Sequence, residues 1–412
     1  MAGPYFDERD TQSPDARERD LFAKLPDYLS DAVAGSEGLA AHLSGHDLST
    51  ITTRDKLASL PVLRKAQLME AQAANPPFGG FANLSALSGT RVFQSPGPIW
   101  EPQGLGIDPW GGARALHAAG FRAGDVVHNA LSYHFTPGGF ILDSSAIALG
   151  CTVFPAGFGQ TEQQVEAAAA LKPVAYTGTP DFLKVMLDKA AEMRVDLTSF
   201  KRAMVSGGAL FPSLRAEYAE RGVQVMQCYA TADLGIIAFE SLHDGEPVPG
   251  MIVNEDFIVE IVRPGTDDPV PAGDVGELVV TNFNPAYPLV RLGTGDLSKV
   301  IDEPSLCGRT NMRLAGWMGR ADQRTKVKGM FVDPKQIDRL VKENDGLSAA
   351  RLVVTRDGEM DAMTLQVVGT GQIDTGAVAA SLREITKLRG DVVQIDELPN
   401  DGKVISDERS YD

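Results

Sequence analysis

The stretch that decides the fold reads LGCTVFPAGFGQTEQQVEAAAALKPVAYTGTP over residues 149–180. A short apolar run, Thr152–Pro155, is followed by a helical pattern over Gln160–Leu171, and a second run, Val174–Thr177, follows at once. Strands that alternate with helices of this length are typical of βαβ units. The stretch therefore predicts a largely parallel sheet.

The same alternation continues on both sides of this stretch. Towards the N-terminus, Val126–Leu131 has the pattern of a strand and Gly138–Gly150 that of an apolar helix. Towards the C-terminus, Thr179–Met193 has a helical pattern and Arg202–Val205 is strand-like. We therefore predict an α/β fold for the central part of the chain.

The pattern changes near residue 250. Val253–Val262, Gly276–Thr281 and Leu297–Ile301 are typical of a β-rich part, which we place at about 250–318. The remainder alternates short strands and helices as a small α+β module. We predict two domains, residues 1–321 and residues 322–412, joined through the polar, glycine-bearing segment Gly319-Arg320-Ala321-Asp322.

The overall composition limits the classes of function. The 412 residues carry a formal net charge of −17, which argues against nucleic acid as a partner, because phosphate backbones require a basic surface. No apolar run reaches the roughly 18 residues of a membrane span, and Met1–Asp10 is unlike a signal peptide. Cys151, Cys228 and Cys307 show no paired-ligand spacing, as expected of thiols in a reducing compartment. We predict a cytoplasmic protein without a membrane partner.

An acidic residue follows a glycine turn at Leu292-Gly293-Thr294-Gly295-Asp296. A carboxylate there can accept hydrogen bonds from both hydroxyl groups of a ribose. Taken alone, Thr-Gly-Asp is a common turn. The motif becomes more specific because three further segments follow it in a fixed order: Gly319-Arg320-Ala321-Asp322, Lys326-Val327-Lys328-Gly329 and Pro399-Asn400-Asp401-Gly402-Lys403.

This order resembles the adenylate-forming superfamily of acyl-CoA synthetases, and phenylacetate–CoA ligases in particular. The resemblance covers nearly the whole chain, and its other segments are Pro77–Gly79, Pro137–Gly139, Leu149–Pro155, Gly159–Glu162, Lys172–Pro173 and Thr179–Pro180. It implies a large N-terminal α/β domain with a β-rich subdomain and a small, mobile C-terminal α+β domain. It also implies a ligase that activates a carboxylic acid with ATP and Mg²⁺ and transfers the acyl group to CoA.

The resemblance assigns roles to residues near the domain boundary and the C-terminus. Asp296 matches the ribose-binding aspartate, Arg320 the arginine after it, and Asp322 the hinge residue. Lys403 matches the catalytic lysine of adenylate formation, where its ammonium would neutralise developing phosphate charge. The alternative for Lys403 is a solvated lysine on a polar tail. Gly329 matches the glycine beside the pantetheine arm of CoA.

Two further segments match the nucleotide site of the family. The adenine-binding turn corresponds to Ser206, Gly207, Gly208 and Ala209, and its alternative is an ordinary strand–helix turn. In Tyr229-Ala230-Thr231-Ala232-Asp233, the resemblance implies that Tyr229 stacks on adenine, that Thr231 or a neighbour contacts phosphate, and that Asp233 binds Mg²⁺. The match is partial, because Ala230 and Ala232 replace a glycine and a threonine.

The phosphate-binding loop departs from the family. Ser95 and Gly97 fit its pattern, but Pro96 and Pro98 remove amide donors and Glu101 stands where the family has lysine. A carboxylate about 5 Å from a phosphate oxygen would cost roughly 3 kcal/mol at an effective dielectric near 20.

We favour an enzyme that binds ATP mainly through Asp296, Arg320, Lys403 and Mg²⁺. A non-catalytic homologue that binds a nucleotide, adenylate or acyl ligand is the alternative, and a third hypothesis keeps the adenylate but replaces CoA with another acceptor.

The acid-binding pocket is expected near Tyr133, His134 and Phe135, which follow a strand where relatives place aromatic residues. The alternative is a core aromatic cluster with a hydrogen-bonded histidine. The apolar stretch Ile236–Ala238 also suits an apolar aryl or small acyl acid. Relatives that carry a structural zinc bind it with cysteines and histidines after the tyrosine-containing element, but here the stretch 235–250 holds one histidine, His243, and no cysteine, so we predict no zinc. A homodimer is consistent with the resemblance.

Overall fold

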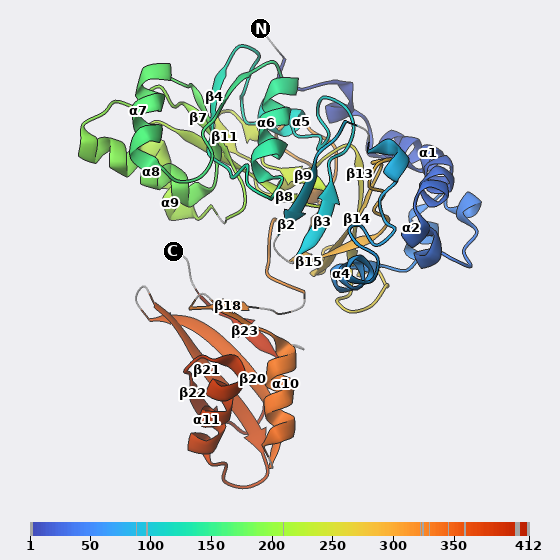
Figure 1. Cartoon of the computed structure of the whole chain (residues 1–412), viewed down its shortest axis with the longest axis vertical. Helices are drawn as coiled ribbons and strands as arrows, with labels where there is room; N and C mark the ends of the chain where they lie inside the picture. The colour runs from blue at the N-terminus through green and yellow to red at the C-terminus, as the bar shows by residue number, and fades with distance from the viewer. Residues whose placement is uncertain are drawn as a thin grey trace. The chain divides into compact units, whose positions relative to one another are not determined.

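The structure is a computed structural model that describes residues 3–87, 89–95, 98–208, 210–321, 323, 325–328, 330–344, 346–357, 360–399 and 404–409, without the side chains at 326, 331, 335, 357 and 360. The chain forms two compact units (Figure 1). The larger unit comprises Met1–Thr294 and Ser298–Trp317, and the smaller comprises Gly295–Leu297 and Met318–Asp412.

The larger unit contains a mixed sheet with the strand order β16-β17-β12-β9-β8-β7-β6-β4-β5. In it β4 pairs in parallel with β5 and β6, β6 with β7, and β7 with β8. The strands of this parallel part are β4 (Val126–Asn129), β5 (Thr152–Pro155), β6 (Ala175–Gly178), β7 (Arg202–Val205) and β8 (Gln224–Thr231). The predicted parallel sheet is confirmed.

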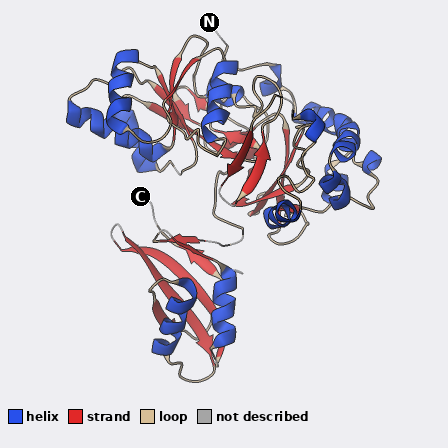
Figure 2. Cartoon of the chain, viewed as in Figure 1, coloured by secondary structure: helices blue, strands red, loops and turns tan. Residues whose placement is uncertain are grey.

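Helices cover both faces of this parallel part (Figure 2). They are α5 (Ala113–Ala118) and α6 (Gly138–Ala148) on one face, and α7 (Thr161–Leu171), α8 (Pro180–Met193) and α9 (Pro212–Glu220) on the other. Neighbouring strand residues point to opposite faces, so Met204 packs with α5 and α6 while Ala203 and Val205 pack with α7–α9. Helix α8 begins where Thr179 accepts a hydrogen bond from the Phe182 amide at 3.3 Å.

The strands that follow β8 in the sequence extend the large sheet as an antiparallel part. Its strands are β9 (Gly235–Phe239), β12 (Met251–Val253), β16 (Val300–Ile301) and β17 (Arg313–Leu314), and a short ribbon, β10 (Leu242–His243) and β11 (Glu246–Pro247), lies between β9 and β12 in the sequence. All four pair antiparallel with their neighbours.

A second sheet, of order β1-β15-β14-β13, packs against the N-terminal helices. Leu25 and Leu29 of α1 belong to the same apolar core as Ile258 and Val280 of the sheet. The strands are β1 (Leu63–Arg64), β13 (Phe257–Val262), β14 (Gly276–Asn282) and β15 (Leu292–Ser298). The helices are α1 (Pro14–Gly35), α2 (Glu37–His42), α3 (Arg54–Ala58) and α4 (Lys65–Ala74), with single 3-10 turns at Glu8–Thr11, Leu48–Thr50 and Leu84–Ala86.

Two strands predicted as continuous are divided in the structure. The expected strand Val253–Val262 is split between β12 and β13, which belong to different sheets. At the break, the Asn254 side-chain amide donates to Gly111 O at 2.7 Å and Ile236 O at 3.0 Å, and Glu255 leaves the strand to pair with Arg17. The expected strand Leu297–Ile301 is divided between β15 and β16.

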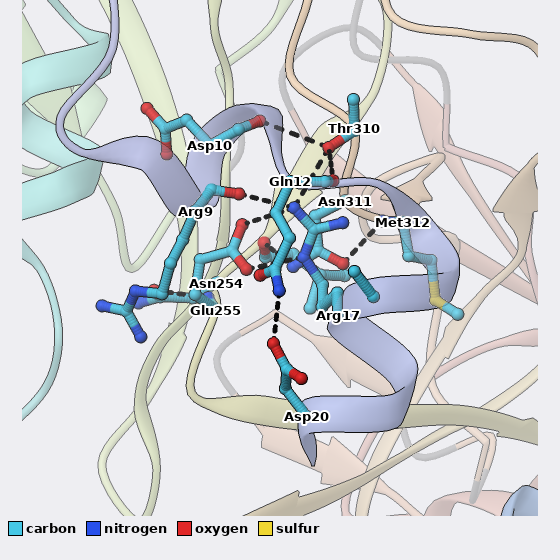
Figure 3. Close-up of polar contacts among 12 residues, drawn as sticks. Arg9, Asp10, Gln12, Arg17, Asp20, Asn254, Glu255, Thr310, Asn311 and Met312 are labelled. Atoms are coloured by element: carbon cyan, nitrogen blue, oxygen red, sulfur yellow. Dashed lines mark hydrogen bonds and ion pairs between the residues drawn. The ribbon is translucent and has the colours of Figure 1, made fainter. Parts of the chain in front are cut away.

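The N-terminal segment is fixed to the body of the larger unit by buried polar contacts (Figure 3). Arg17 Nε lies 2.6 Å from Glu255 Oε2, and both side chains are buried. Arg17 Nη2 also donates to Arg9 O at 2.6 Å and Thr310 Oγ1 at 3.1 Å. Three segments distant in sequence therefore meet at one arginine.

The smaller unit is an α+β module with a sheet of order β22-β21-β20-β23. Helices α10 and α11 pack on this sheet through Ile337, Leu340 and Leu382, which share a core with Leu352 and Leu365. Its elements are β18 (Thr325–Val327), β19 (Met330–Val332), α10 (Pro334–Glu343), β20 (Leu347–Asp357), β21 (Met360–Gly369), α11 (Thr375–Thr386), β22 (Asp391–Gln394) and β23 (Ile405–Asp407). Among the helices of the described residues, none has the length and hydropathy needed to cross a membrane.

Candidate active site

The turn after β7 lies at the carboxyl edge of the parallel strands, where α/β sheets bind ligands. Ser206 Oγ donates to the Cys228 carbonyl of β8 at 3.0 Å, and Gln227 Nε2 donates to the Gly208 carbonyl at 3.0 Å. Gly207 has φ +74°, a conformation that favours glycine. The predicted adenine turn at Ser206–Gly208 is thus held against the next strand, while Ala209 lies outside the described residues.

Strand β8 delivers Tyr229 and Thr231 to the same edge. Its pairing with β9 shifts register between Tyr229 and Ala230, an irregularity of the kind that redirects side chains. Thr231 Oγ1 accepts a hydrogen bond from the Leu234 amide at 3.3 Å and so closes the turn between β8 and β9. The roles of Tyr229 at adenine and Thr231 at phosphate stay predictions.

Asp233 lies in that turn with its side chain buried. Its Oδ2 accepts a hydrogen bond from Lys65 Nζ at 2.6 Å, and Lys65 is the first residue of α4. Lys65 could not be predicted from the sequence, because 168 residues separate it from Asp233 and no local pattern indicates the pairing. The fold thus places a lysine beside the predicted magnesium ligand.

The segment aligned with the phosphate loop is a β-hairpin in this chain. Strands β2 (Val92–Ser95) and β3 (Ile99–Pro102) pair antiparallel, with Ser95 opposite Ile99. Ser95 Oγ, expected to contact phosphate, donates to Glu101 Oε1 at 2.6 Å. Gly97 lies outside the described residues.

Glu101 points into the protein and is only 2% exposed. Burial and then the charge of Asp233 raise the pKa of Glu101 to about 9. The carboxyl group of Glu101 is therefore buried close to Asp233, whose charge acts on it, and its place beside bound phosphate stays a prediction.

The three residues predicted for the acid pocket have different surroundings. Tyr133 is partly buried, donates from its hydroxyl to Asp143 Oδ1 at 2.9 Å and accepts from Asn129 Nδ2 at 2.7 Å. His134 and Phe135 are exposed and stack on each other, with ring centroids 6.3 Å apart. Their role in binding the acid stays a prediction.

Asp296 and Arg320 come together within the smaller unit. Arg320 Nη1 lies 3.1 Å from Asp296 Oδ1, and their backbones form a β-bridge. The Ala321 amide donates to the Gly295 carbonyl at 2.8 Å, and Gly295 has φ +77°. The predicted ribose-binding aspartate and the following arginine are thus adjacent. Lys403, Asp322 and Gly329 lie outside the described residues.

Comparison with known proteins connects this geometry to a family. The family model described as AMP-binding enzyme matches residues 111–286. The chain is 32% identical to the phenylacetate-coenzyme A ligase of Aromatoleum evansii over 326 residues, 76% of this chain and 72% of that protein. It is 31% identical to the phenylacetate-coenzyme A ligase of Thermus thermophilus, again over 76% and 72% of the two chains.

The solved structures agree on the fold. The crystal structure of 2-hydroxyisobutyryl-CoA ligase with 2-HIB-AMP and CoA matches with a TM-score of 0.73 at 23% identity, covering 99% of this chain and 93% of that one. The chain has the adenylate-forming enzyme fold. It belongs to the AMP-forming acid–CoA ligase family.

Proposed function

We propose that the chain activates an apolar aryl or small acyl carboxylic acid with ATP, through an acyl-adenylate, and transfers the acyl group to CoA. The observation that carries the proposal is the meeting of Ser206–Gly208, Tyr229 and Asp233 at the carboxyl ends of two adjacent strands. The identity to proteins named phenylacetate-coenzyme A ligase supports a phenylacetate-like acid.

Asp233 is the proposed ligand for Mg²⁺, and the donor chemistry fits. Its Oδ1 is buried and has no hydrogen-bond partner among the described residues, and a carboxylate oxygen is a preferred ligand of Mg²⁺. The bound ion would neutralise phosphate charge, while Lys65 orients the Asp233 carboxylate from its other oxygen.

The remaining roles follow from the resemblance. Asp296 would accept hydrogen bonds from the ribose, Arg320 would support it, and Lys403 would act in adenylate formation. Gly329 would line the path of CoA. The proposed domains, 1–321 and 322–412, would rearrange about Asp322 between the two half-reactions, while Tyr133, His134 and Phe135 would contact the acid.

A specific feature favours a second candidate, a non-catalytic homologue that binds nucleotide or adenylate. The β2–β3 hairpin places a buried glutamate where the family loop has a lysine, and Pro98 has no amide hydrogen to donate. Such a protein would retain the binding turns and lose the chemistry.

Pyrophosphate release from Mg-ATP tests the proposal, with a panel of aryl and short acyl acids, each with and without CoA. Release with one acid class together with acyl-CoA formation is the expected result, and Lys403→Ala should suppress it. Release without acyl-CoA would indicate another acceptor. Absence of release with every acid, alongside AMP binding by calorimetry, would favour the non-catalytic homologue.

A further inference from the structure

Glu101 and Asp233 form a pair of buried carboxyl groups with an unusual set of contacts. Each group has one oxygen held by a donor, since Glu101 Oε1 accepts from Ser95 Oγ at 2.6 Å and Asp233 Oδ2 accepts from Lys65 Nζ at 2.6 Å. Their other oxygens, Glu101 Oε2 and Asp233 Oδ1, are buried and have no hydrogen-bond partner among the described residues.

Two carboxylate oxygens cannot bond to each other, because both are acceptors. The two groups nevertheless lie close enough for the charge of Asp233 to raise the pKa of Glu101, and Glu101 and Asp233 are 2% and 5% exposed. A proton or a cation shared between the groups would relieve the repulsion between their charges in this buried position.

The charges favour a divalent cation once phosphate is present. With both carboxylates ionised, Lys65, Asp233 and Glu101 sum to one negative charge, and a divalent ion brings the sum to one positive charge. That is the sign that a lysine at position 101 would have supplied in the phosphate loop.

We propose that Glu101 and Asp233 together bind a divalent cation of the Mg²⁺ type, with Glu101 as the second protein ligand. The inference deepens the proposed function, because Asp233 is the magnesium ligand proposed there. No group of three or more His, Cys, Asp or Glu side chains in the described parts of the chain is arranged to hold a metal. Water and phosphate oxygens therefore complete the coordination, as is usual for Mg²⁺.

The position of the pair is consistent with a small ion. Ser95 and Glu101 lie on facing strands of the β2–β3 hairpin, and Asp233 lies in the β8–β9 turn, so the ion connects the hairpin to the sheet. Asp233 also lines a pocket of about 220 Å³ with Asn254, Asn282 and Asn284.

Binding of Mn²⁺ to the full chain without nucleotide, followed by electron paramagnetic resonance, tests the inference. The expected result is one Mn²⁺ site per chain, from which Mg²⁺ displaces the Mn²⁺. Glu101→Gln and Asp233→Asn should each lower the affinity for Mn²⁺ at least 10-fold. Glutamine keeps the shape of Glu101 and can donate to Asp233, so this variant should remain folded. The matched control is Glu70→Gln, an exposed glutamate of α4, which should bind Mn²⁺ as the parent does.

Two outcomes would overturn the inference. Equal Mn²⁺ affinity in the parent and Glu101→Gln would exclude Glu101 as a ligand. No Mn²⁺ binding by the parent at millimolar concentration would show that the pair holds a proton only. Pyrophosphate release is measured separately, so a chain that binds Mn²⁺ through Glu101 but forms no adenylate would retain this inference and reject the proposed function.

Discussion

The side chain of Gln72 of α4 is hydrogen-bonded to both the backbone amide and the backbone carbonyl of Trp100. The Trp100 amide donates to Gln72 Oε1 at 2.8 Å, and Gln72 Nε2 donates to the Trp100 carbonyl at 2.9 Å. Tyr287 also donates to that carbonyl, at 3.5 Å. One buried amide side chain therefore fixes strand β3, and with it Glu101, to the N-terminal helices.

Gln72→Ala should release the hairpin. An unmade buried hydrogen bond costs about 1–3 kcal/mol, so we expect the free energy of unfolding to fall by about 2 kcal/mol. The amides of β2 and β3 should also exchange hydrogen faster, which mass spectrometry after deuterium labelling measures. The control is Gln163→Ala, which changes an exposed glutamine of α7. Equal hydrogen exchange in both variants would show that Gln72 does not hold the hairpin in place.

The buried Arg17–Glu255 pair should be costly to break. Burial raises the pKa of Glu255 despite the opposing effect of Arg17, so each charge depends on its partner. Glu255→Ala should lower the free energy of unfolding by about 3–5 kcal/mol, since it leaves Arg17 buried and uncompensated. Arg17→Met combined with Glu255→Leu should lose less than the sum of the single changes.

Urea unfolding of the single and double variants measures this coupling. The exposed pair Arg339–Glu343, with N–O distance 2.7 Å, gives the control, and Glu343→Ala should change stability by less than about 1 kcal/mol. Additive losses at Arg17 and Glu255 would show that the pair does not act as a unit.

Local patterns predicted most of the fold. The elements over residues 126–205 match within a few residues because each depends on its own periodicity and caps, as at Thr179. The break after Val253 was missed, because Glu255 is turned out of the strand by Arg17, which is 238 residues away. A one-dimensional pattern carries no information on such a partner.

The site residues that could be predicted from the sequence are those at the end of a strand or in the turn that follows it directly. Ser206–Gly208 and Tyr229 lie at strand ends, so their common edge follows from the parallel order. Lys65 and the inward position of Glu101 depend on contacts between α4, the hairpin and the β8–β9 turn. Those contacts exist only once the sheets have packed.

His117 should make stability depend on pH. Its side chain is buried, and burial, followed by the charges of Arg122 and Arg309, lowers its pKa from 6.5 to about 4. Between these values the unfolded chain binds more protons than the folded one, so the free energy of unfolding falls as the pH falls. The expected loss from this group is about 2 kcal/mol between pH 7 and pH 4.5.

Glutamine cannot be protonated in this pH range, so in His117→Gln the free energy of unfolding should depend less on pH than in the parent. Urea unfolding at pH 7 and pH 4.5 measures the difference, with His46→Gln, an exposed histidine, as the control. An identical pH dependence in His117→Gln and the parent would show that His117 is protonated equally in both states.

Asp296→Ala should weaken ATP binding. Two hydrogen bonds from the ribose to a carboxylate contribute about 1.5–3 kcal/mol, so we expect the Kd for ATP to rise about 10- to 100-fold. Calorimetric titration measures the affinity, and Asp302→Ala, an exposed aspartate, is the control. Unchanged affinity would assign Asp296 only to its ion pair with Arg320.

Lys65→Ala should reduce adenylate formation more than it reduces stability. Lys65 Nζ donates to Asp233 Oδ2 at 2.6 Å, so the variant loses the partner of the proposed magnesium ligand and a positive charge beside the proposed phosphate site. Loss of one such charge in a catalytic site costs about 100-fold in rate.

The rate of pyrophosphate release with the active acid measures this loss, and unfolding of the same variant shows how much stability Lys65 contributes. Lys56→Ala, an exposed lysine of α3, should leave the rate unchanged. If Lys65→Ala kept the parental rate, the ammonium would serve only to hold Asp233 in place, and the phosphate charge would have to be neutralised by the cation and by Lys403.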